Sequence, residues 1–311
     1  MSKNPEISVA VCTYNRSDVL PKCLESLADQ SADAELFEVL IIDNNSTDDT
    51  KKIALDFCEK HNNFRYIFEE KQGLSHARNR AIEEAKGEYL SYIDDDAIAD
   101  KEWIQSILDC FNETNADVVG GPVKSFIDTE KIPCFYDAKT HDFYCGYERK
   151  RLQPPNFSFG FSGCNTCFKR SLFDEFGTYL TDLGMIGNKQ RMGEDSEMGY
   201  RLLKAGKIFY YEPGMKIDHH IRMNNITFTG LLKRSYDTGI EIGKIIRNDL
   251  SFLKKLKKIA APFVYAFLFL FLFPFYCIKG PCFFAKKAKQ ITYTFGVALN
   301  IVKNQEPNHG I

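Results

Sequence analysis

Short apolar runs alternate with amphipathic segments along the first hundred residues. Apolar strand-forming residues fill positions 7–12, 36–42, 65–68 and 89–93. Between these runs, for example over 19–27 and 73–85, apolar side chains recur every three or four residues, which predicts helices. Strands that alternate with helices at this spacing predict an α/β fold with a Rossmann-like, mostly parallel twisted sheet flanked by helices.

Polar clusters follow three of the predicted strands directly. They are Thr13-Tyr14-Asn15-Arg16, Asp43-Asn44-Asn45-Ser46 and Asp94-Asp95-Asp96. In a doubly wound sheet, ligands bind outside the carboxyl ends of the strands, so these clusters predict a nucleotide-sized pocket. Neither G-x-G-x-x-G nor G-x-x-x-x-G-K-[ST] follows an early strand, which argues against dinucleotide oxidoreductases and P-loop phosphotransferases.

The acidic triplet suits a divalent cation. Adjacent carboxylates repel one another unless a cation lies between them. Mg²⁺ or Mn²⁺ held by one or two carboxylates and by substrate phosphates would stabilise a departing diphosphate. We interpret Asp94-x-Asp96 as a metal site, with a solvated acidic turn as the alternative. His219 or His220, after a later strand, could complete the metal shell, although structural histidines fit the pattern equally well.

A second candidate for chemistry stands at the start of a later helix. Gly193-Glu194-Asp195 opens an amphipathic segment that Gly206 ends. An acceptor hydroxyl needs a general base, and Asp195 is our candidate for it. A helix-capping role is the alternative for Asp195. The two roles are compatible, because the positive end of the helix dipole favours a negative side chain there.

The C-terminal part has a different pattern. Apolar and basic residues interleave over 240–259, which predicts an interfacial helix beside anionic lipid. No charge falls within 259–278, which predicts a membrane segment. Pro262 and Pro274 could bend it into a re-entrant hairpin, and a buried core hairpin is a further alternative. We therefore expect a catalytic domain over 1–225, a basic amphipathic helical region over 226–258, and a membrane-attachment segment and tail over 259–311.

Composition narrows the partners and the compartment. The 40 basic and 42 acidic residues leave a net charge of -2, so we expect no nucleic-acid partner. The ten cysteines are scattered in a chain of 311 residues, which is typical of reduced thiols, and we interpret the Cys164-x-x-Cys167 spacing as coincidence. No apolar signal segment precedes the first strand, so we expect the catalytic domain to stay in the cytoplasm.

The ordered motifs together resemble family 2 glycosyltransferases of the GT-A fold, from Ile7 to about Gly239. VAVCTYNR is similar to the opening strand and nucleotide loop, which implies donor contacts from Thr13, Tyr14, Asn15 and Arg16. IIDNNSTDDT is similar to the second-strand motif, in which Asp43 would contact the base. GLSHARNRAI resembles the segment that lines the donor, which implies roles for Arg78 and Asn79. YIDDDA matches the D-x-D metal motif.

The later motifs complete the resemblance. FSGCNTCFKRSLFDEFG resembles the acceptor-side segment, here Gly163, Cys164 and Asn165. GEDSEMGYRLLKAG resembles the catalytic "ED" motif, here Glu194 and Asp195, and EPGMKIDHHI the stretch that places a histidine near the metal. The sequence departs from the family at Asn225, where many relatives carry Arg, and it lacks the Q-x-x-R-W signature of processive members.

The resemblance implies an inverting, non-processive enzyme. Asp195 would be the base, Asp96 the principal ligand of Mn²⁺ or Mg²⁺ with Asp94 and His219 beside it, and Asp94 or Asp95 would lie near the donor ribose. The implied donor is a nucleotide diphosphate sugar, and the address favours a glycan or lipid-linked acceptor at the cytoplasmic face of a membrane. A catalytically silent nucleotide-sugar-binding membrane protein is the alternative. A nucleotidyltransferase ranks last, because the first loop lacks the glycines that cradle a triphosphate.

Overall fold

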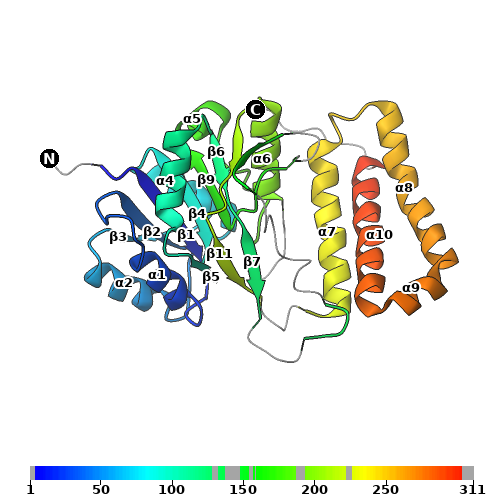
Figure 1. Ribbon diagram of the computed structural model, residues 1–311, viewed down its shortest axis with the longest axis horizontal. Helices are drawn as coiled ribbons and strands as arrows, with labels where there is room; N and C mark the ends of the chain where they lie inside the picture. Colours follow the sequence, from blue (N-terminus) through cyan, green and yellow to red (C-terminus); the bar gives the residue numbers. More distant parts are fainter. Residues whose placement is uncertain are drawn as a thin grey trace. The chain divides into compact units, whose positions relative to one another are not determined.

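The chain divides into two compact units in the computed structural model (Figure 1). The structure describes residues 4–127, 132–136, 148–153, 157, 159–186, 193–221 and 226–302. The first unit comprises Met1–Phe126 and Lys139–His220, and the second comprises Ile127–Ala138 and Ile221–Ile311. We call them the sheet unit and the helical unit. The predicted limits of the catalytic and C-terminal domains stay a prediction.

The N-terminal half of the sheet unit is a parallel α/β structure, as the apolar runs predict. Its elements are β1 (Ile7–Thr13), α1 (Leu20–Ala28), β2 (Phe37–Asp43), α2 (Thr50–Lys60), β3 (Phe64–Phe68), α3 (Leu74–Glu84) and β4 (Tyr89–Asp94). The strands lie in the order β3-β2-β1-β4 and all pair in parallel. Strands covered on both faces need apolar residues at nearly every position, which explains the continuous runs in the sequence.

Four further strands of the described part of the chain extend this sheet on the β4 side. The additional elements are α4 (Trp103–Glu113), β6 (Val118–Gly120), β8 (Lys150–Leu152), β9 (Asn165–Lys169), α5 (Ser171–Phe176), α6 (Glu194–Lys204) and β10 (Phe209–Tyr211). β9 lies between β4 and β6 and is antiparallel to both, while β6 and β10 pair in parallel. The full order is β3-β2-β1-β4-β9-β6-β10-β8. This mostly parallel sheet flanked by helices confirms the predicted GT-A-like fold class.

A small second sheet follows the acidic triplet. It consists of β5 (Ala97–Ala99), β11 (Ile217–His220) and β7 (Val123–Phe126), in the order β5-β11-β7. β11 pairs antiparallel with β5, and His219 lies opposite Ala97 in the register. This pairing brings a residue more than a hundred positions downstream beside the turn that carries Asp94, Asp95 and Asp96.

The large sheet has a separate apolar core on each face. Successive β1 side chains alternate between the faces, so Val9 and Val11 join one core while Ala10 joins the other. The first core contains the fully buried Trp103 of α4, and the second contains Phe209 of β10. Burial of apolar area on both faces holds the strand ends in fixed positions for the loops that follow them.

The helical unit contains α7 (Phe228–Ile246), α8 (Phe252–Phe271), α9 (Phe273–Lys279) and α10 (Pro281–Val302). α7 and α10 lie side by side (Figure 1), with glycines where they approach most closely. A Cβ atom on Gly239 would lie 2.1 Å from the Tyr293 carbonyl oxygen, and one on Gly296 would lie 2.2 Å from that of Tyr236. Only residues without a side chain permit this backbone separation.

The helices of this unit are interrupted at two places where the sequence pattern is continuous. The single interfacial helix expected over 240–259 is interrupted, since α7 ends at Ile246 and α8 begins at Phe252. The segment 259–278 does not form one straight helix, since α8 ends at Phe271 and α9 restarts at Phe273 with Pro274 in its first turn. Proline has no amide hydrogen and obstructs the preceding turn, so a helix restarts there more easily than it continues.

Across the described part of the chain, no helix combines the length and the apolar character that crossing a bilayer requires. The expectation that 259–278 spans a membrane as one straight helix is therefore not supported.

Candidate active site

The acidic triplet forms the turn between β4 and β5, and His219 of β11 faces it. The Nε2 atom of His219 lies 3.2 Å from Asp96 Oδ1 and 3.7 Å from Asp94 Oδ2. The candidate ligand atoms of Asp94, Asp96 and His219 all lie within 4.8 Å of one another. Ligand atoms bound about 2.1 Å from one ion lie at most about 4.2 Å apart, so a small adjustment would let this set hold a divalent cation.

His220, the second candidate histidine, places its ring against Phe126. The backbone amide of His220 donates to the Asp96 carbonyl oxygen over 2.9 Å, and its ring centroid lies 5.2 Å from that of Phe126. His219 is therefore the histidine that faces the carboxylates. The sequence alone did not distinguish the two.

The triplet and His219 are electrostatically coupled. Burial would lower the pKa of His219, but hydrogen bonds to Asp94 and Asp96 raise it to about 10. Burial would raise the pKa of Asp96, but the hydrogen bond from His219 and the charge of Arg16 lower it. The two carboxylates thus favour a positive charge opposite them. A metal ion bound there would supply that charge, and His219 would have to lose its Nε2 proton to become a ligand.

Arg16 joins the first loop to the triplet. Its Nε atom donates to Asp95 Oδ1 over 3.1 Å, and its Nη2 atom donates to Asp96 Oδ2. Asp95 is only 6% exposed. Burial raises its pKa to about 7, against the opposing charge of Arg16. The middle carboxylate is therefore held by Arg16, while its neighbours face His219.

The first and second loops interlock, as their positions after parallel strands predict. Asn15, in the left-handed region with a φ of 51°, accepts a hydrogen bond from the Thr47 amide over 2.7 Å. Its own amide donates to Ser46 Oγ over 2.9 Å. Thr13, which is 2% exposed, lies opposite Asp43 in the β1–β2 register. Tyr14 is half-buried in the same loop.

The carboxylate of Asp43 is buried and makes hydrogen bonds within the fold. Asp43 is 1% exposed, and its carboxylate accepts hydrogen bonds from the Ser46 amide over 3.0 Å and from the Tyr66 hydroxyl over 2.9 Å. Tyr66 had no assigned role in the sequence, although its position on the adjacent strand β3, at the sheet edge, placed it within reach. The expected contact between Asp43 and a nucleotide base stays a prediction.

Asp195 is the second residue of α6, and Gly163 holds its side chain. Gly193, with a φ of 105°, occupies the N-cap position, so Asp195 does not cap the helix itself. The Gly163 amide donates to Asp195 Oδ2 over 2.9 Å, and the Ser196 amide donates to Asp195 Oδ1 over 2.7 Å. The structure thus brings the candidate base together with the candidate acceptor-side segment.

Arg78 and Glu194 form a buried ion pair beside Asp195. Their side chains are 4% and 8% exposed, and Arg78 Nη1 lies 3.0 Å from Glu194 Oε1. Burial opposes the charge on Arg78, but the Glu194 carboxylate raises the pKa of Arg78 above its usual range. Burial raises the pKa of Glu194 to about 7, while Arg78 acts to lower it. Both residues were expected at the active site, but not as partners.

The side chains of Asn79 and Asn165 make hydrogen bonds to other residues of the protein. The Asn79 amide group donates to the Tyr179 carbonyl oxygen and accepts from the Tyr179 amide, both over 2.9 Å. Asn165 is 1% exposed; its Oδ1 atom accepts from Trp103 Nε1 over 2.9 Å, and its Nδ2 atom donates to the Met215 carbonyl oxygen over 2.8 Å. These contacts are of the kind that structural residues make, and the expected donor and acceptor roles of the two side chains stay predictions.

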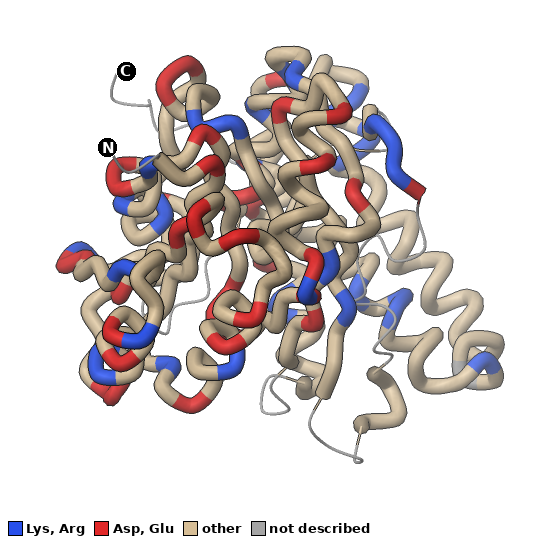
Figure 2. The backbone as a smooth tube through the Cα atoms, turned by 60° about the vertical axis from the view of Figure 1, so that its left-hand side comes forward, with Lys and Arg blue, Asp and Glu red and all other residues tan. Residues whose placement is uncertain are grey.

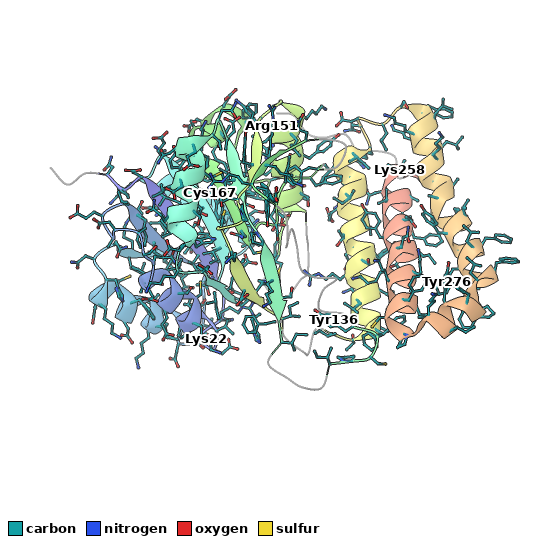
Figure 3. The ribbon with its side chains drawn as sticks, in the orientation of Figure 1. Lys22, Tyr136, Arg151, Cys167, Lys258 and Tyr276 are labelled. Atoms are coloured by element: carbon teal, nitrogen blue, oxygen red, sulfur yellow. The ribbon has the colours of Figure 1, made fainter. Side chains whose placement is uncertain are left out.

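Cys164 and Cys167, the C-x-x-C pair, are both buried. Burial raises the pKa of the Cys164 thiol well above its usual range, and Ser162 Oγ lies 3.2 Å from its sulfur. Both cysteines are free in the structure, and Cys167 lies on β9 (Figure 3). Asn225, where the sequence departs from the family, lies outside the described residues.

The chain is similar to known glycosyltransferases. The family model described as "Glycosyl transferase family 2" matches residues 8–177. Glycosyltransferase AglE of Haloferax volcanii is 35% identical over 121 residues, which are 39% of this chain and 40% of that protein. The glucosyl-dolichyl phosphate glucuronosyltransferase of the same organism is 26% identical over 238 residues, 75% of each chain.

A third relative and two solved structures extend the likeness. The GalNAc(5)-diNAcBac-PP-undecaprenol beta-1,3-glucosyltransferase of Campylobacter jejuni is 26% identical over 256 residues, 80% of this chain and 77% of that protein. Mannosyltransferase PcManGT from Pyrobaculum calidifontis, in complex with GDP-Man and Mn²⁺, has a TM-score of 0.61 at 16% identity, covering 96% of this chain and 74% of that one. S. aureus TarS 1–349 with UDP-GlcNAc has a TM-score of 0.56 at 16% identity, covering 93% and 91%. These structures share the fold.

Proposed function

The chain belongs to glycosyl transferase family 2 and is a glycosyltransferase, and from this premise we propose that it inverts the configuration at the anomeric carbon of the sugar that it transfers. The donor in this proposal is a nucleoside diphosphate sugar, and the acceptor is a hydroxyl of a glycan or lipid-linked saccharide. The observation that carries this proposal is the approach of His219 to Asp94 and Asp96. These three side chains could hold a cation, which would stabilise the negative charge of a departing diphosphate.

The residues around the triplet would bind the donor. A divalent cation, Mn²⁺ or Mg²⁺, held by Asp94, Asp96 and His219 would stabilise the negative charge that the diphosphate gains as it leaves. Arg16 adds a fixed positive charge beside these residues, since it already contacts Asp95 and Asp96. The interlocked loops after β1 and β2 would bind the nucleoside, with Asp43 toward the base.

Asp195 would activate the acceptor. Its carboxylate would take the proton from the acceptor hydroxyl while the hydroxyl oxygen bonds to the anomeric carbon and the bond to the diphosphate breaks. A single displacement of this kind inverts the anomeric centre, as in inverting glycoside hydrolysis. The Gly163 and Ser196 amides orient the carboxylate in the structure, which supports this role.

The relatives indicate which acceptor to test first. The printed names of two relatives contain a polyisoprenoid carrier, dolichyl phosphate in one and PP-undecaprenol in the other. We therefore propose a lipid-linked saccharide acceptor and a role in the assembly of a surface polysaccharide or glycolipid. The absence of the Q-x-x-R-W signature supports the addition of one or a few sugars.

Membrane attachment through α8 and α9 fits this acceptor. Residues 259–278 carry no charge and form an unbroken tan stretch in Figure 2. Large apolar side chains of this segment are exposed, among them Phe267 at 70% and Leu270 at 72%. Lysines occupy the first half of α8, including Lys258, while Tyr276 lies on α9 (Figure 3). We propose that this segment inserts as a bent, interfacial hairpin at the cytoplasmic face.

A nucleotide-release screen tests the function. The full chain is incubated with UDP-, GDP- and dTDP-sugars and a lipid-linked saccharide, with and without Mn²⁺, and the released nucleotide is measured. We expect release from one donor class. Asp195→Asn should lower turnover at least about a hundredfold while leaving nucleotide binding nearly intact, because it removes only the base. Unchanged turnover in this variant would show that Asp195 is not the base. Nucleotide binding without release from any donor would favour a silent binding protein.

A further inference from the structure

Within the motif that resembles a donor-binding segment, residues 73–82, Arg78 is paired with Glu194. We propose that the Arg78–Glu194 ion pair is a buried strut that positions Asp195, and that Arg78 does not contact the donor. The proposal rests on the proposed function, since it takes Asp195 as the catalytic base. Arg78 and Glu194 are then positioning residues.

The Arg78 side chain is buried, with aromatic rings and a carboxylate as its neighbours. Its guanidinium carbon lies 5.7 Å from the centroid of the Tyr92 ring and 5.3 Å from that of Tyr179. Glu194 neutralises its charge at 3.0 Å, and the Tyr92 hydroxyl donates to its carbonyl oxygen over 3.0 Å. A guanidinium that is 4% exposed, paired and flanked by aromatic faces has little surface left for a diphosphate.

One end of the Arg78–Glu194 ion pair lies against Gly163, whose amide hydrogen-bonds to Asp195, the proposed base. A Cβ atom on Gly163 would lie 2.4 Å from Arg78 Nη2, so the Gly163 backbone lies against the guanidinium. The amide of the same glycine donates to Asp195 Oδ2 over 2.9 Å. At its other end the strut binds Glu194, the residue that precedes Asp195 in α6. Movement of Arg78 would therefore shift Asp195 from both sides.

The rest of the motif holds the segment that leads along the chain toward α6. The Leu74 amide donates to the Met185 carbonyl oxygen over 2.8 Å, and Ser75 Oγ donates to that of Leu183 over 2.8 Å. Asn79 adds the paired hydrogen bonds to Tyr179 described above. Leu74, Ser75 and Asn79 of α3 thus hold residues in the segment 179–185, and Arg78 lies next to Asn79 in the same helix.

A strut of this kind affects chemistry more than binding. A displacement of about 1 Å in a reacting group can lower turnover about a hundredfold, while contacts to the nucleotide stay intact. A direct contact between Arg78 and the diphosphate would have the opposite signature, because its loss would weaken nucleotide binding. The two roles therefore separate in a measurement of turnover against nucleotide affinity.

The principal test is the double variant Arg78→Met/Glu194→Gln. Removal of one partner alone would leave an unpaired buried charge, so both charges are removed together. The probes are UDP, GDP and dTDP, each with Mn²⁺, titrated by calorimetry, and turnover is measured with the donor found in the release screen. We expect nucleotide Kd within about twofold of the parent chain and kcat lowered about tenfold to a hundredfold.

The control removes other ion pairs of the same helix, those of Glu84 with Arg80 and with Arg65. Arg80 and Glu84 of α3 lie 2.8 Å apart, and Arg80 is 37% exposed. Arg80→Met/Glu84→Gln should leave both kcat and nucleotide Kd unchanged. A fall in kcat for both double variants would assign the effect to general loosening of α3 and overturn the strut.

Two further outcomes decide the proposal. A rise of about tenfold or more in nucleotide Kd for Arg78→Met/Glu194→Gln would place Arg78 on the donor and overturn it, as would an unchanged kcat. If this variant does not fold, Arg78→Lys and Glu194→Asp retain both charges and carry the same comparison. If instead Asp195→Asn is fully active, the proposed function fails; if Asp195→Asn is inactive and the double variant is fully active, only the strut fails.

Discussion

At the scale of single residues, the acidic triplet divides into two kinds of side chain. Asp94 and Asp96 face His219, while Asp95 lies against Arg16. The sequence places all three at a strand end but gives each the same chemistry. Their separation arises in the turn after β4, where Asp95 contacts Arg16 alone of the two cations and Asp96 contacts both Arg16 and His219. The first and third carboxylates can therefore meet one ligand that the second does not reach.

The metal role of Asp96 is tested by removing its charge. Asp96→Asn should weaken Mn²⁺ binding at least about tenfold, because losses of this size follow even from changes beside a metal ligand. Mn²⁺ affinity is measured by calorimetry, and activity is followed after EDTA treatment and after Mn²⁺ is restored. Asp100→Asn is the control, since Asp100 pairs only loosely with Lys216 at 3.7 Å. Full activity in EDTA would exclude the metal role.

The buried amide of Asn165 is expected to stabilise the fold. Asn165→Leu removes the acceptor of the Trp103 indole and the donor to two carbonyl oxygens, those of Met215 and Pro122. The Pro122 carbonyl oxygen keeps the Ile217 amide as a donor, so two buried groups are left without a partner. We expect the free energy of unfolding to fall by about 2–6 kcal/mol, because each such group costs about 1–3 kcal/mol. Urea unfolding measures the change. Asn63→Ala, which loses one partly buried hydrogen bond of 3.4 Å, should cost much less.

At the scale of elements, strand pairing and helix contact decide the site and the C-terminal unit. β11 delivers His219 only because it pairs with β5. α7 and α10 approach closely only because glycines replace side chains between them. The interrupted helices at 247–251 and at Leu272 have the same character. Apolar and basic residues interleave across the first break, and the second lies within the uncharged run 259–278. Periodicity identifies helical segments, but turns within a continuous pattern depend on what the helices pack against.

The close contact between α7 and α10 predicts the direction in which Gly296→Ala changes the thermal stability. Alanine is favoured over glycine inside a helix by about 1 kcal/mol, so Gly296→Ala would stabilise an isolated helix. Here the added Cβ atom would lie 2.2 Å from the Tyr236 carbonyl oxygen. We therefore expect a lower thermal midpoint for Gly296→Ala and no lowering for Gln290→Ala, at an exposed position of the same helix. An increased midpoint for Gly296→Ala would contradict the close contact.

At the scale of the whole molecule, charge and apolar surface are distributed unequally along the chain. The net charge of -2 conceals a C-terminal segment in which lysines precede and follow an uncharged stretch. Scattered apolar residues on a surface need no explanation, but a run of exposed phenylalanines and leucines indicates an apolar partner. The exposed residues on α8 therefore support attachment to lipid more strongly than the uncharged sequence did by itself.

The attachment is tested on the full chain with vesicles. Phe267→Ser/Leu270→Ser/Phe271→Ser removes three side chains that are 70%, 72% and 75% exposed. Each contributes about 1.5 kcal/mol or more when buried, so we expect binding to vesicles of phosphatidylglycerol and phosphatidylcholine to fall at least about a hundredfold. Sedimentation with vesicles measures it. Phe68→Ser, on β3 and 49% exposed, should leave binding unchanged. Equal binding by the triple variant would exclude α8 as the attachment site.

The sequence by itself determined the order of strands and helices over the first hundred residues, the class of the fold and most of the candidate site residues. The polar clusters after β1, β2 and β4, and Asp195 at the start of α6, were all identifiable because a strand end or a helix start has a local signal. Family resemblance then gave these positions expected roles.

Only the tertiary structure decided which of these residues are partners. Arg16 with Asp95, Arg78 with Glu194, and His219 with Asp96 are pairs far apart in the chain. Each pair forms through strand order and the packing of helices on the sheet, which no local pattern specifies. For the same reason Arg78, read as a donor contact in the sequence, is paired with Glu194 inside the fold. A side chain's type and neighbours along the chain indicate what chemistry it can do, and its surroundings in three dimensions decide which chemistry remains open to it.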